Sequence, residues 1–81
     1  MNFEKFVNLS PEEQSESVFV EAVEVATHQD NEYDYILYQL HSFYVERKYS
    51  RTTQNLVYIV AFDSSSKLLD VYLKHVNLVF K

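Results

Sequence analysis

The side chains best suited to chemistry are three histidines, His28, His41 and His75. Histidine is both a common metal ligand and an acid–base group at neutral pH. Zinc-binding pairs on a helix lie four residues apart, with further ligands nearby, whereas these three are spread along the chain and no cysteine accompanies them. We therefore expect His28 in a turn, His41 at a bend and His75 near a helix end, rather than a metal site.

Three acidic residues, Asp30, Glu32 and Asp34, alternate along the chain as the ligands of a hard cation do. A calcium-binding loop of this kind also needs a central glycine and a bidentate glutamate at its last position. The chain contains no glycine, and position 41, where the glutamate would fall, is His. The pattern indicates a solvated acidic turn.

The remaining candidates for catalysis lack the setting that catalysis needs. Glu46 and Asp63 could approach His41 or His75, but no spacing requires it. The serines at 64–66 lack the glycine-flanked turn that presents a nucleophile. The absence of glycine also excludes a P-loop and a dinucleotide-binding fingerprint. We expect no enzymatic activity and no cofactor.

Basic and aromatic residues interleave in the middle of the chain, at Tyr44, Arg47, Lys48, Arg51 and Tyr58. On one sheet face, such residues stack on the bases and neutralise the phosphates of single-stranded nucleic acid. Arg47, Lys48 and Arg51 are thus a candidate basic patch. Three clustered bases in a chain of net charge −5 argue against this partner, and packing between neighbouring strands explains the same residues.

Composition points to a single small domain over residues 1–81. Hydrophobic residues make up 47% of the chain, with seven Tyr and six Phe, so a folded core is expected. With no cysteine, apolar burial must hold the fold together. The N-terminal residues do not resemble a signal peptide and no run of about 20 apolar residues occurs. We expect a cytoplasmic protein with no membrane partner.

Charge is divided unevenly between the two halves of the chain. Residues 1–40 contain nine acids and one base, a net charge of −8, whereas residues 41–81 carry +3. A solvated acidic helix explains this distribution. It also suits an acidic inhibitor or immunity-type protein that covers a basic site on a partner, with the contacting glutamates Glu12, Glu13, Glu16, Glu21 and Glu24.

The first expected element is a helix from Ser10 to about Ser17. Ser10 followed by Pro11 and, three residues later, Glu13 forms a capping box. Residues 18–26 fit either a helix or a strand, because their β-branched content favours a strand and the preceding glutamates favour a helix. We predict that helix gives way to strand near Phe19.

Three strands are expected next, at Tyr35–Leu40, Phe43–Tyr49 and Leu56–Phe62, with a polar hairpin connection between the last two. The run Leu56–Phe62 is apolar on both faces, which is typical of a central, doubly covered strand. After Asp63 an apolar stripe predicts a helix, and the tail 77–81 is expected to dock against the sheet.

These elements predict the α+β class: an N-terminal helix, an antiparallel meander of three or four strands, and a C-terminal helix packed on one sheet face. An all-α alternative would make helices of residues 11–28, 33–48 and 65–79. It conflicts with Leu56–Phe62, which is short and rich in β-branched residues.

Part of the chain resembles a known group of proteins. The residues concerned are Leu37–Glu46, the triplet Val60–Phe62, and the pattern Ser65-x-x-Leu68-Leu69-x-x-Tyr72-Leu73. Through these residues the chain resembles a group of small uncharacterised bacterial proteins, and the similarity covers roughly residues 33–78. The resemblance implies a strand meander that ends in a short helix, and it implies no activity.

The amount of apolar surface is the best indication of function. Two short helices can cover only part of a meander whose strands are apolar on both faces, and uncovered apolar surface usually marks a protein interface. We therefore expect a non-enzymatic protein-interaction module that forms a homodimer, or binds another protein, through an apolar tyrosine-rich sheet face. The candidate anchors are Tyr38, Tyr44 and Tyr58.

Overall fold

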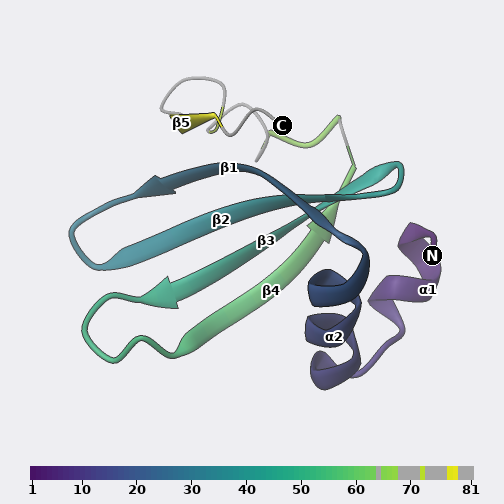
Figure 1. Ribbon diagram of the computed structural model, residues 1–81, viewed down its shortest axis with the longest axis horizontal. Coiled ribbons are helices and arrows are strands. Elements are labelled where there is room, and N and C mark those ends of the chain that lie inside the picture. Colours follow the sequence, from purple (N-terminus) through teal and green to yellow (C-terminus); the bar gives the residue numbers. More distant parts are fainter. Residues whose placement is uncertain (64, 68–71, 73–76, 79–81) are drawn as a thin grey trace.

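The computed structural model describes residues 1–63, 65–67, 72 and 77–78. Helices α1 (Phe3–Val7) and α2 (Pro11–Glu21) come first in the chain. They are followed by strands β1 (Val23–Gln29), β2 (Tyr33–Leu40), β3 (Phe43–Ser50), β4 (Leu56–Phe62) and β5 (Asn77–Leu78) (Figure 1).

The strands form one antiparallel sheet in the order β4-β3-β2-β1-β5. Strands β1 to β4 are the predicted meander, which confirms the α+β class, and the all-α alternative is wrong. The predicted central position of Leu56–Phe62 is also wrong, because β4 lies at an edge of the sheet and pairs only with β3 within the described residues. Apolar residues on both faces of β4 therefore do not reflect cover by two neighbouring strands.

The helical segment is longer than predicted. Ser10 Oγ accepts from the Glu13 backbone N–H, and the Glu13 carboxylate accepts from the Ser10 N–H, which forms the expected capping box. From this start the helix continues to Glu21 instead of ending near Ser17, and Val23 begins β1. Burial of Val18 against the sheet offsets the modest helix propensity of a β-branched residue.

Two residues adopt the left-handed backbone conformation that glycine usually occupies in other proteins, and this chain contains no glycine. His41 has φ 59° in the two-residue connection between β2 and β3, and Gln54 has φ 63° before β4. A non-glycine residue in this region costs about 1–2 kcal/mol. The bend predicted at His41 is thus confirmed as a tight turn, which fixes the pairing of Leu40 with Phe43.

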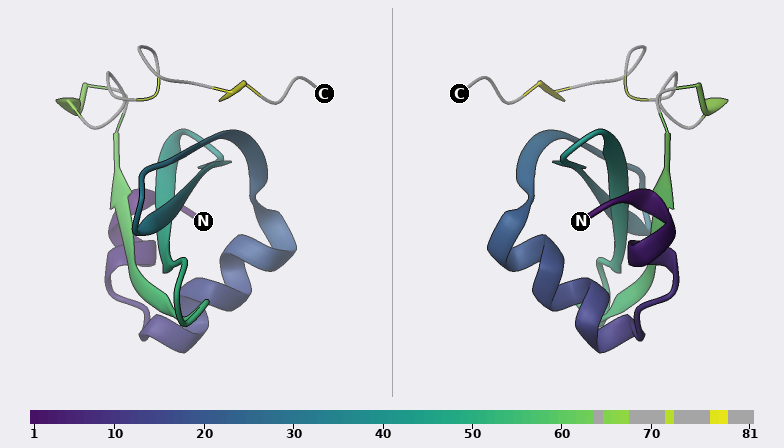
Figure 2. Two further views of the ribbon diagram at one scale, coloured as in Figure 1. Left: turned by 90° about the vertical axis from the view of Figure 1, so that its left-hand side faces the viewer. Right: turned by 90° about the vertical axis from the view of Figure 1, so that its right-hand side faces the viewer.

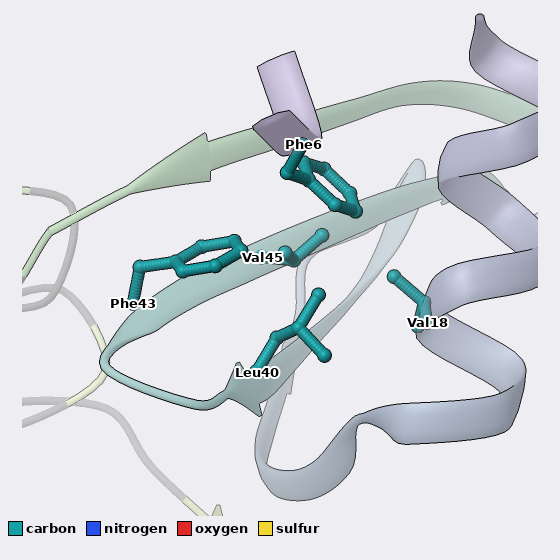
Figure 3. Packing of buried hydrophobic residues seen from close by; sticks show 5 residues of the cluster. All are labelled: Phe6, Val18, Leu40, Phe43 and Val45. Carbon is teal, nitrogen blue, oxygen red and sulfur yellow. The ribbon is translucent and has the colours of Figure 1, made fainter. Parts of the chain in front are cut away.

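The sheet buries residues on both faces. On the face toward the helices, called here the helix face, Phe6 of α1 and Val18 of α2 pack against three sheet residues, Leu40, Phe43 and Val45 (Figure 3). The helices lie at the end of the sheet near the β2–β3 turn (Figure 1; Figure 2). On the opposite face, a second cluster contains Ala26, Leu37, Phe62 and Tyr72.

The C-terminal region is described only in part. Asp63 Oδ1 accepts from both the N–H and the hydroxyl of Ser65, a turn that follows β4 directly. The predicted C-terminal helix falls largely on positions outside the described residues. Of the tail, Asn77 and Leu78 pair with Thr27 and Ala26 of β1.

Phenylalanine positions provide a test of this packing. Phe43→Ala removes a ring that is only 1% exposed, so we expect the free energy of unfolding to fall by about 3–5 kcal/mol in urea denaturation. Phe19→Ala is the matched control, because its ring is 81% exposed and its loss should change stability by no more than about 0.5 kcal/mol. Equal losses at the two positions would contradict the assignment of the core.

Candidate interaction surfaces

A buried carboxylate lies in the middle of the opposite face. Glu46 of β3 is 3% exposed, and its two carboxylate oxygens accept hydrogen bonds from the hydroxyls of Tyr58 and Tyr72. Burial, and then the bond to Glu46, raise the pKa of both phenols well above the ordinary value. The arrangement satisfies a group that would otherwise be costly to bury, and it joins β3 and β4 to Tyr72.

Lys48 lies next to this group and is surrounded by aromatic rings. Its Nζ is 3.9 Å from the ring centre of Tyr33 and 5.4 Å from those of Tyr35 and Tyr58. An ammonium over aromatic faces at these distances is held by cation–π attraction. The surrounding rings explain why a lysine is tolerated on this partly covered face.

The candidate basic patch is divided between two faces and a turn. Arg47 lies on the helix face, with its guanidinium 5.9 Å from the Tyr38 ring centre and 5.2 Å from that of Tyr49. Lys48 points to the opposite face, as adjacent strand residues must. Arg51 follows β3 in a turn. The structure therefore does not bring the three bases together on one surface for a nucleic acid.

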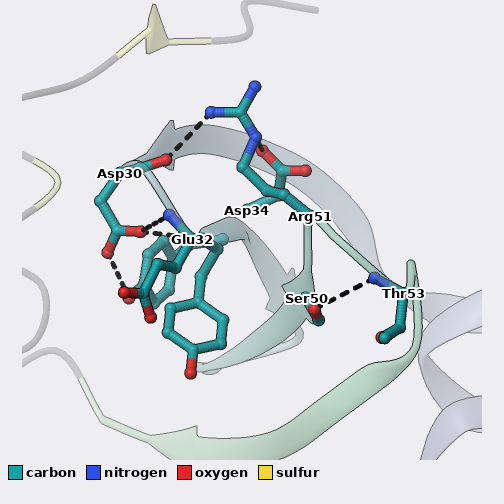
Figure 4. A network of polar contacts seen from close by, with 8 residues as sticks. Asp30, Glu32, Asp34, Ser50, Arg51 and Thr53 are labelled. Atoms are coloured by element: carbon teal, nitrogen blue, oxygen red, sulfur yellow. Dashed lines mark hydrogen bonds and ion pairs between the residues drawn. The ribbon is translucent and has the colours of Figure 1, made fainter.

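The acidic turn is also organised by its own hydrogen bonds. Asp30 Oδ1 accepts from the backbone N–H groups of Glu32 and Tyr33, and these bonds lower the pKa of Asp30 (Figure 4). The Arg51 guanidinium donates to the Asp30 carbonyl oxygen, and its Nε lies 3.7 Å from Asp34 Oδ1. This turn, predicted as a solvated acidic turn, connects β1 to β2 and contacts the turn between β3 and β4.

The two histidines within the described residues have separate neighbours. His28 lies on β1 rather than in the predicted turn, and its ring stacks on Tyr35 at 4.1 Å. His41 Nε2 lies 3.3 Å from a carboxylate oxygen of Glu21. No group of three potential metal ligands occurs among the described residues.

The three candidate anchor tyrosines do not share a face. Tyr38 pairs with Val45 and packs in the helix-face cluster. Tyr44 pairs with Phe62, with the rings 5.9 Å apart, and Tyr58 pairs with Lys48. Tyr44 and Tyr58 therefore lie together on the opposite face, and Tyr38 lies apart from them.

Exposed apolar side chains are concentrated at other positions. On β4, three residues are substantially exposed: Leu56 (39%), Val57 (49%) and Val60 (36%). On α2 and at the start of β1, Phe19 and Val20 are 81% and 70% exposed, and Val23 is 49% exposed. Val60 extends the face of Tyr44 and Tyr58 to the sheet edge, whereas Leu56 pairs with Tyr49 on the helix face. The α2 residues form a surface that the sequence reasoning missed, although Phe19 and Val20 are adjacent and cannot both face the core from one helix.

A hollow of about 660 Å³ lies over the helix face, at the end of the sheet away from the helices. Ile36 and Tyr49 contribute apolar surface to it, and Thr27 and Gln54 contribute polar groups. Its charged groups, Asp34 and Arg51, lie beside each other. No unmatched charge among these residues selects one class of ligand.

Comparison of the chain with protein-family models, curated proteins and solved structures finds no match. The resemblance to small bacterial proteins thus stays a prediction. Among the described residues, no helix is long and apolar enough to cross a membrane.

The tyrosine–glutamate group makes stability sensitive to alkaline pH. Tyr58 and Tyr72 remain protonated to a higher pH in the folded chain than in the unfolded one, where phenols ionise near pH 10. Burial and the bond to Asp30 likewise raise the pKa of Tyr35 to about 12. Stability from these groups is complete below about pH 10 and is lost as the pH rises through the folded-state pKa values. We expect the free energy of unfolding to fall above about pH 10.

Tyr72→Phe should remove part of this alkaline fall and, near neutral pH, lower the free energy of unfolding by about 1–3 kcal/mol, because one bond to the buried carboxylate is lost. Tyr44→Phe is the control, since it removes a hydroxyl on the same face that does not bond to Glu46. Urea unfolding from about pH 7 to 11, with tyrosinate absorbance as a second readout, checks both. Identical pH profiles for the wild type and Tyr72→Phe would contradict the role of this group.

Proposed function

We propose that this chain is a non-enzymatic protein-interaction module that self-associates at the β4 side of its sheet. The observation that carries the proposal is the exposed apolar surface of β4, where Leu56, Val57 and Val60 are 39%, 49% and 36% exposed on a strand at the sheet edge. Soluble proteins seldom leave such an edge open, because its free N–H and C=O groups accept another strand.

The composition of β4 suits pairing with a copy of itself. The sequence Leu56–Phe62 contains no charged residue, so two antiparallel copies place no like charges opposite each other. It also contains neither Lys nor Pro, the residues that commonly block an edge strand. A two-fold axis brings the same surface of each copy together, as in most homodimers. The alternating backbone groups that point away from β3 then find partners.

One feature of β4 limits where the regular ladder can form. Lys48 pairs with Tyr58 but Tyr49 pairs with Leu56, which leaves Val57 as an extra residue in the strand. Such a bulge twists an edge and weakens pairing locally. Regular pairing is therefore expected from Tyr58 onward, with Leu56 and Val57 contributing side-chain contacts.

The tyrosines extend this surface without carrying it alone. Tyr58 and Val60 of β4 lie on the opposite face with Tyr44 of β3. Tyrosine is enriched at interfaces because its ring is large and its hydroxyl can remain hydrated or bonded. Tyr44 and Tyr58 thus stay in the proposed contact, whereas Tyr38, on the helix face, is left out of it.

Several carboxylates that catalysis might use already have structural partners. Glu46 accepts from two tyrosine hydroxyls, and Asp30 from backbone amides of its own turn. These bonds support a structural role for both groups and favour a binding function over an enzymatic one.

A charge placed on β4 tests the proposed dimer. Val57→Lys should weaken self-association at least tenfold, about 1.4 kcal/mol, because the contact would bury a lysine charge among apolar side chains, and a lysine on an edge strand opposes pairing with another strand. Sedimentation equilibrium over a wide concentration range measures the effect.

The matched control is Val20→Lys, which adds the same charge at an exposed valine of α2. Dimer affinity should be the same for this variant as for the wild type, and urea unfolding should show that both variants fold. A wild-type chain that is monomeric throughout the concentration range, or dissociation caused by Val20→Lys alone, would refute the proposed contact.

A further inference from the structure

A second exposed apolar surface lies on α2. Phe19 and Val20 are 81% and 70% exposed, although the residue before them, Val18, is buried against the sheet. Val23, at the start of β1, is also exposed, at 49%. An aromatic ring this exposed contributes little to the fold. Exposed rings of this kind are frequent anchors of protein interfaces.

A shallow hollow of about 290 Å³ runs beside this apolar surface. Met1, Leu9 and Val20 supply apolar side chains to its lining, and Glu13, Glu16 and Glu21 supply carboxylates. Apolar walls with acids around them match the chemistry of a lysine or arginine side chain, which has an aliphatic stem and a cationic head. Hydrogen bonds from Ser10 lower the pKa of Glu13, so this carboxylate stays ionised over a wide pH range.

Helical spacing aligns acids with the apolar residues. Glu12, Glu16 and Val20 follow at intervals of four, and Phe19 is three residues after Glu16, so all four lie along one stripe of α2. Glu12, Glu16, Phe19 and Val20 are all exposed. The stripe is therefore acidic at its N-terminal end and apolar at its C-terminal end.

This charge pattern selects the class of partner. Two copies of the chain meeting through α2 would bring glutamates against glutamates, which is unfavourable. Nucleic acid and anionic lipid surfaces are repelled for the same reason. A basic protein surface is attracted, and its cations match both the stripe and the hollow.

We propose that the outer surface of α2 is a docking site for a basic segment of another protein, with Phe19 and Val20 as apolar anchors and a lysine or arginine of the partner in the adjacent hollow. None of the residues of this site belongs to β4, so the proposal goes beyond self-association and does not depend on it. Electrostatic attraction speeds association with the partner, and burial of Phe19 and Val20 stabilises the complex.

The test uses the full chain and a defined probe, a synthetic amphipathic helical peptide with Lys on one face and Leu on the other. Fluorescence anisotropy should show saturable binding that weakens at least tenfold when salt is raised from about 50 to about 500 mM, because screening shortens the reach of the charges. Backbone amide shifts in NMR spectra should be concentrated in α2 and the start of β1.

Two pairs of variants separate the contributions. Phe19→Ala with Val20→Ala, and separately Glu12→Gln with Glu16→Gln, should each weaken binding at least tenfold, without disturbing the Ser10–Glu13 capping box. The matched control for charge is Glu4→Gln with Glu32→Gln, which removes two acids away from α2 and should change affinity by less than about twofold. A counterpart peptide with Glu in place of Lys should not bind.

Binding by the Val57→Lys variant distinguishes this site from the dimer contact. The proposal expects this variant to bind the peptide as the wild type does, whether or not the wild type dimerises. The docking site is overturned if the peptide fails to bind, if either α2 pair leaves the affinity unchanged, or if the shifted amides lie on β3 and β4.

Discussion

The burial of Glu46 is the constraint on which much of this structure depends. A carboxylate that is 3% exposed in the middle of a sheet must receive hydrogen bonds, or its burial would cost more than neighbouring packing could offset. The residues on either side of it in β3, Val45 and Arg47, cannot supply them, because they point to the other face. The donors come from Tyr58 on the adjacent strand and from Tyr72 near the end of the chain. The second of these bonds brings a distant part of the sequence onto the opposite face.

This use of the tyrosines affects the rest of the surface. Tyr58 is engaged with Glu46 and Lys48, and Tyr35 with Asp30 and His28, so several aromatic rings of the opposite face serve internal contacts. The exposed apolar side chains outside these contacts include those at the β4 edge and those on α2. The two regions differ in charge, since β4 has none and α2 is strongly acidic. The same physical rule, that like charges do not face each other, therefore permits a second copy at β4 and favours a basic partner at α2.

Local patterns in the sequence were enough to predict most of the fold. Apolar and β-branched runs bounded by polar turns located three strands, the capping box located the start of α2, and the bounds of Leu56–Phe62 match β4. The helix end near Phe19 was misplaced because valines at 18 and 20 favour a strand locally, whereas burial of Val18 on the sheet decides for helix. The five-residue helix α1 was not predicted, since so short a helix is held by its Asn2 cap and the burial of Phe6 rather than by propensity.

The candidate surfaces were harder to predict, because they depend on strand order and register. Side chains alternate between the two faces of any strand, so the spacing of Arg47 and Lys48 was an argument against a single basic patch that the sequence analysis did not use. Placing Tyr38 opposite Val45 requires the two-residue turn at His41, where a left-handed residue that is not glycine gives little sequence signal. The order of β1 to β4 is that of the predicted meander, whereas the pairing of β5 with β1 depends on tertiary contacts and had no local signal.

The prediction that Leu56–Phe62 is a central strand was wrong for a physical reason that bears on function. A strand that is apolar on both faces is usually central, because two neighbours and two layers cover it. β4 has this composition but pairs with a single described strand, and three of its apolar residues are exposed. In a single copy of the chain, the apolar composition of β4 does not match its position at the edge of the sheet. A second copy paired along β4 would make the strand internal to a larger sheet, and its composition would then suit its position.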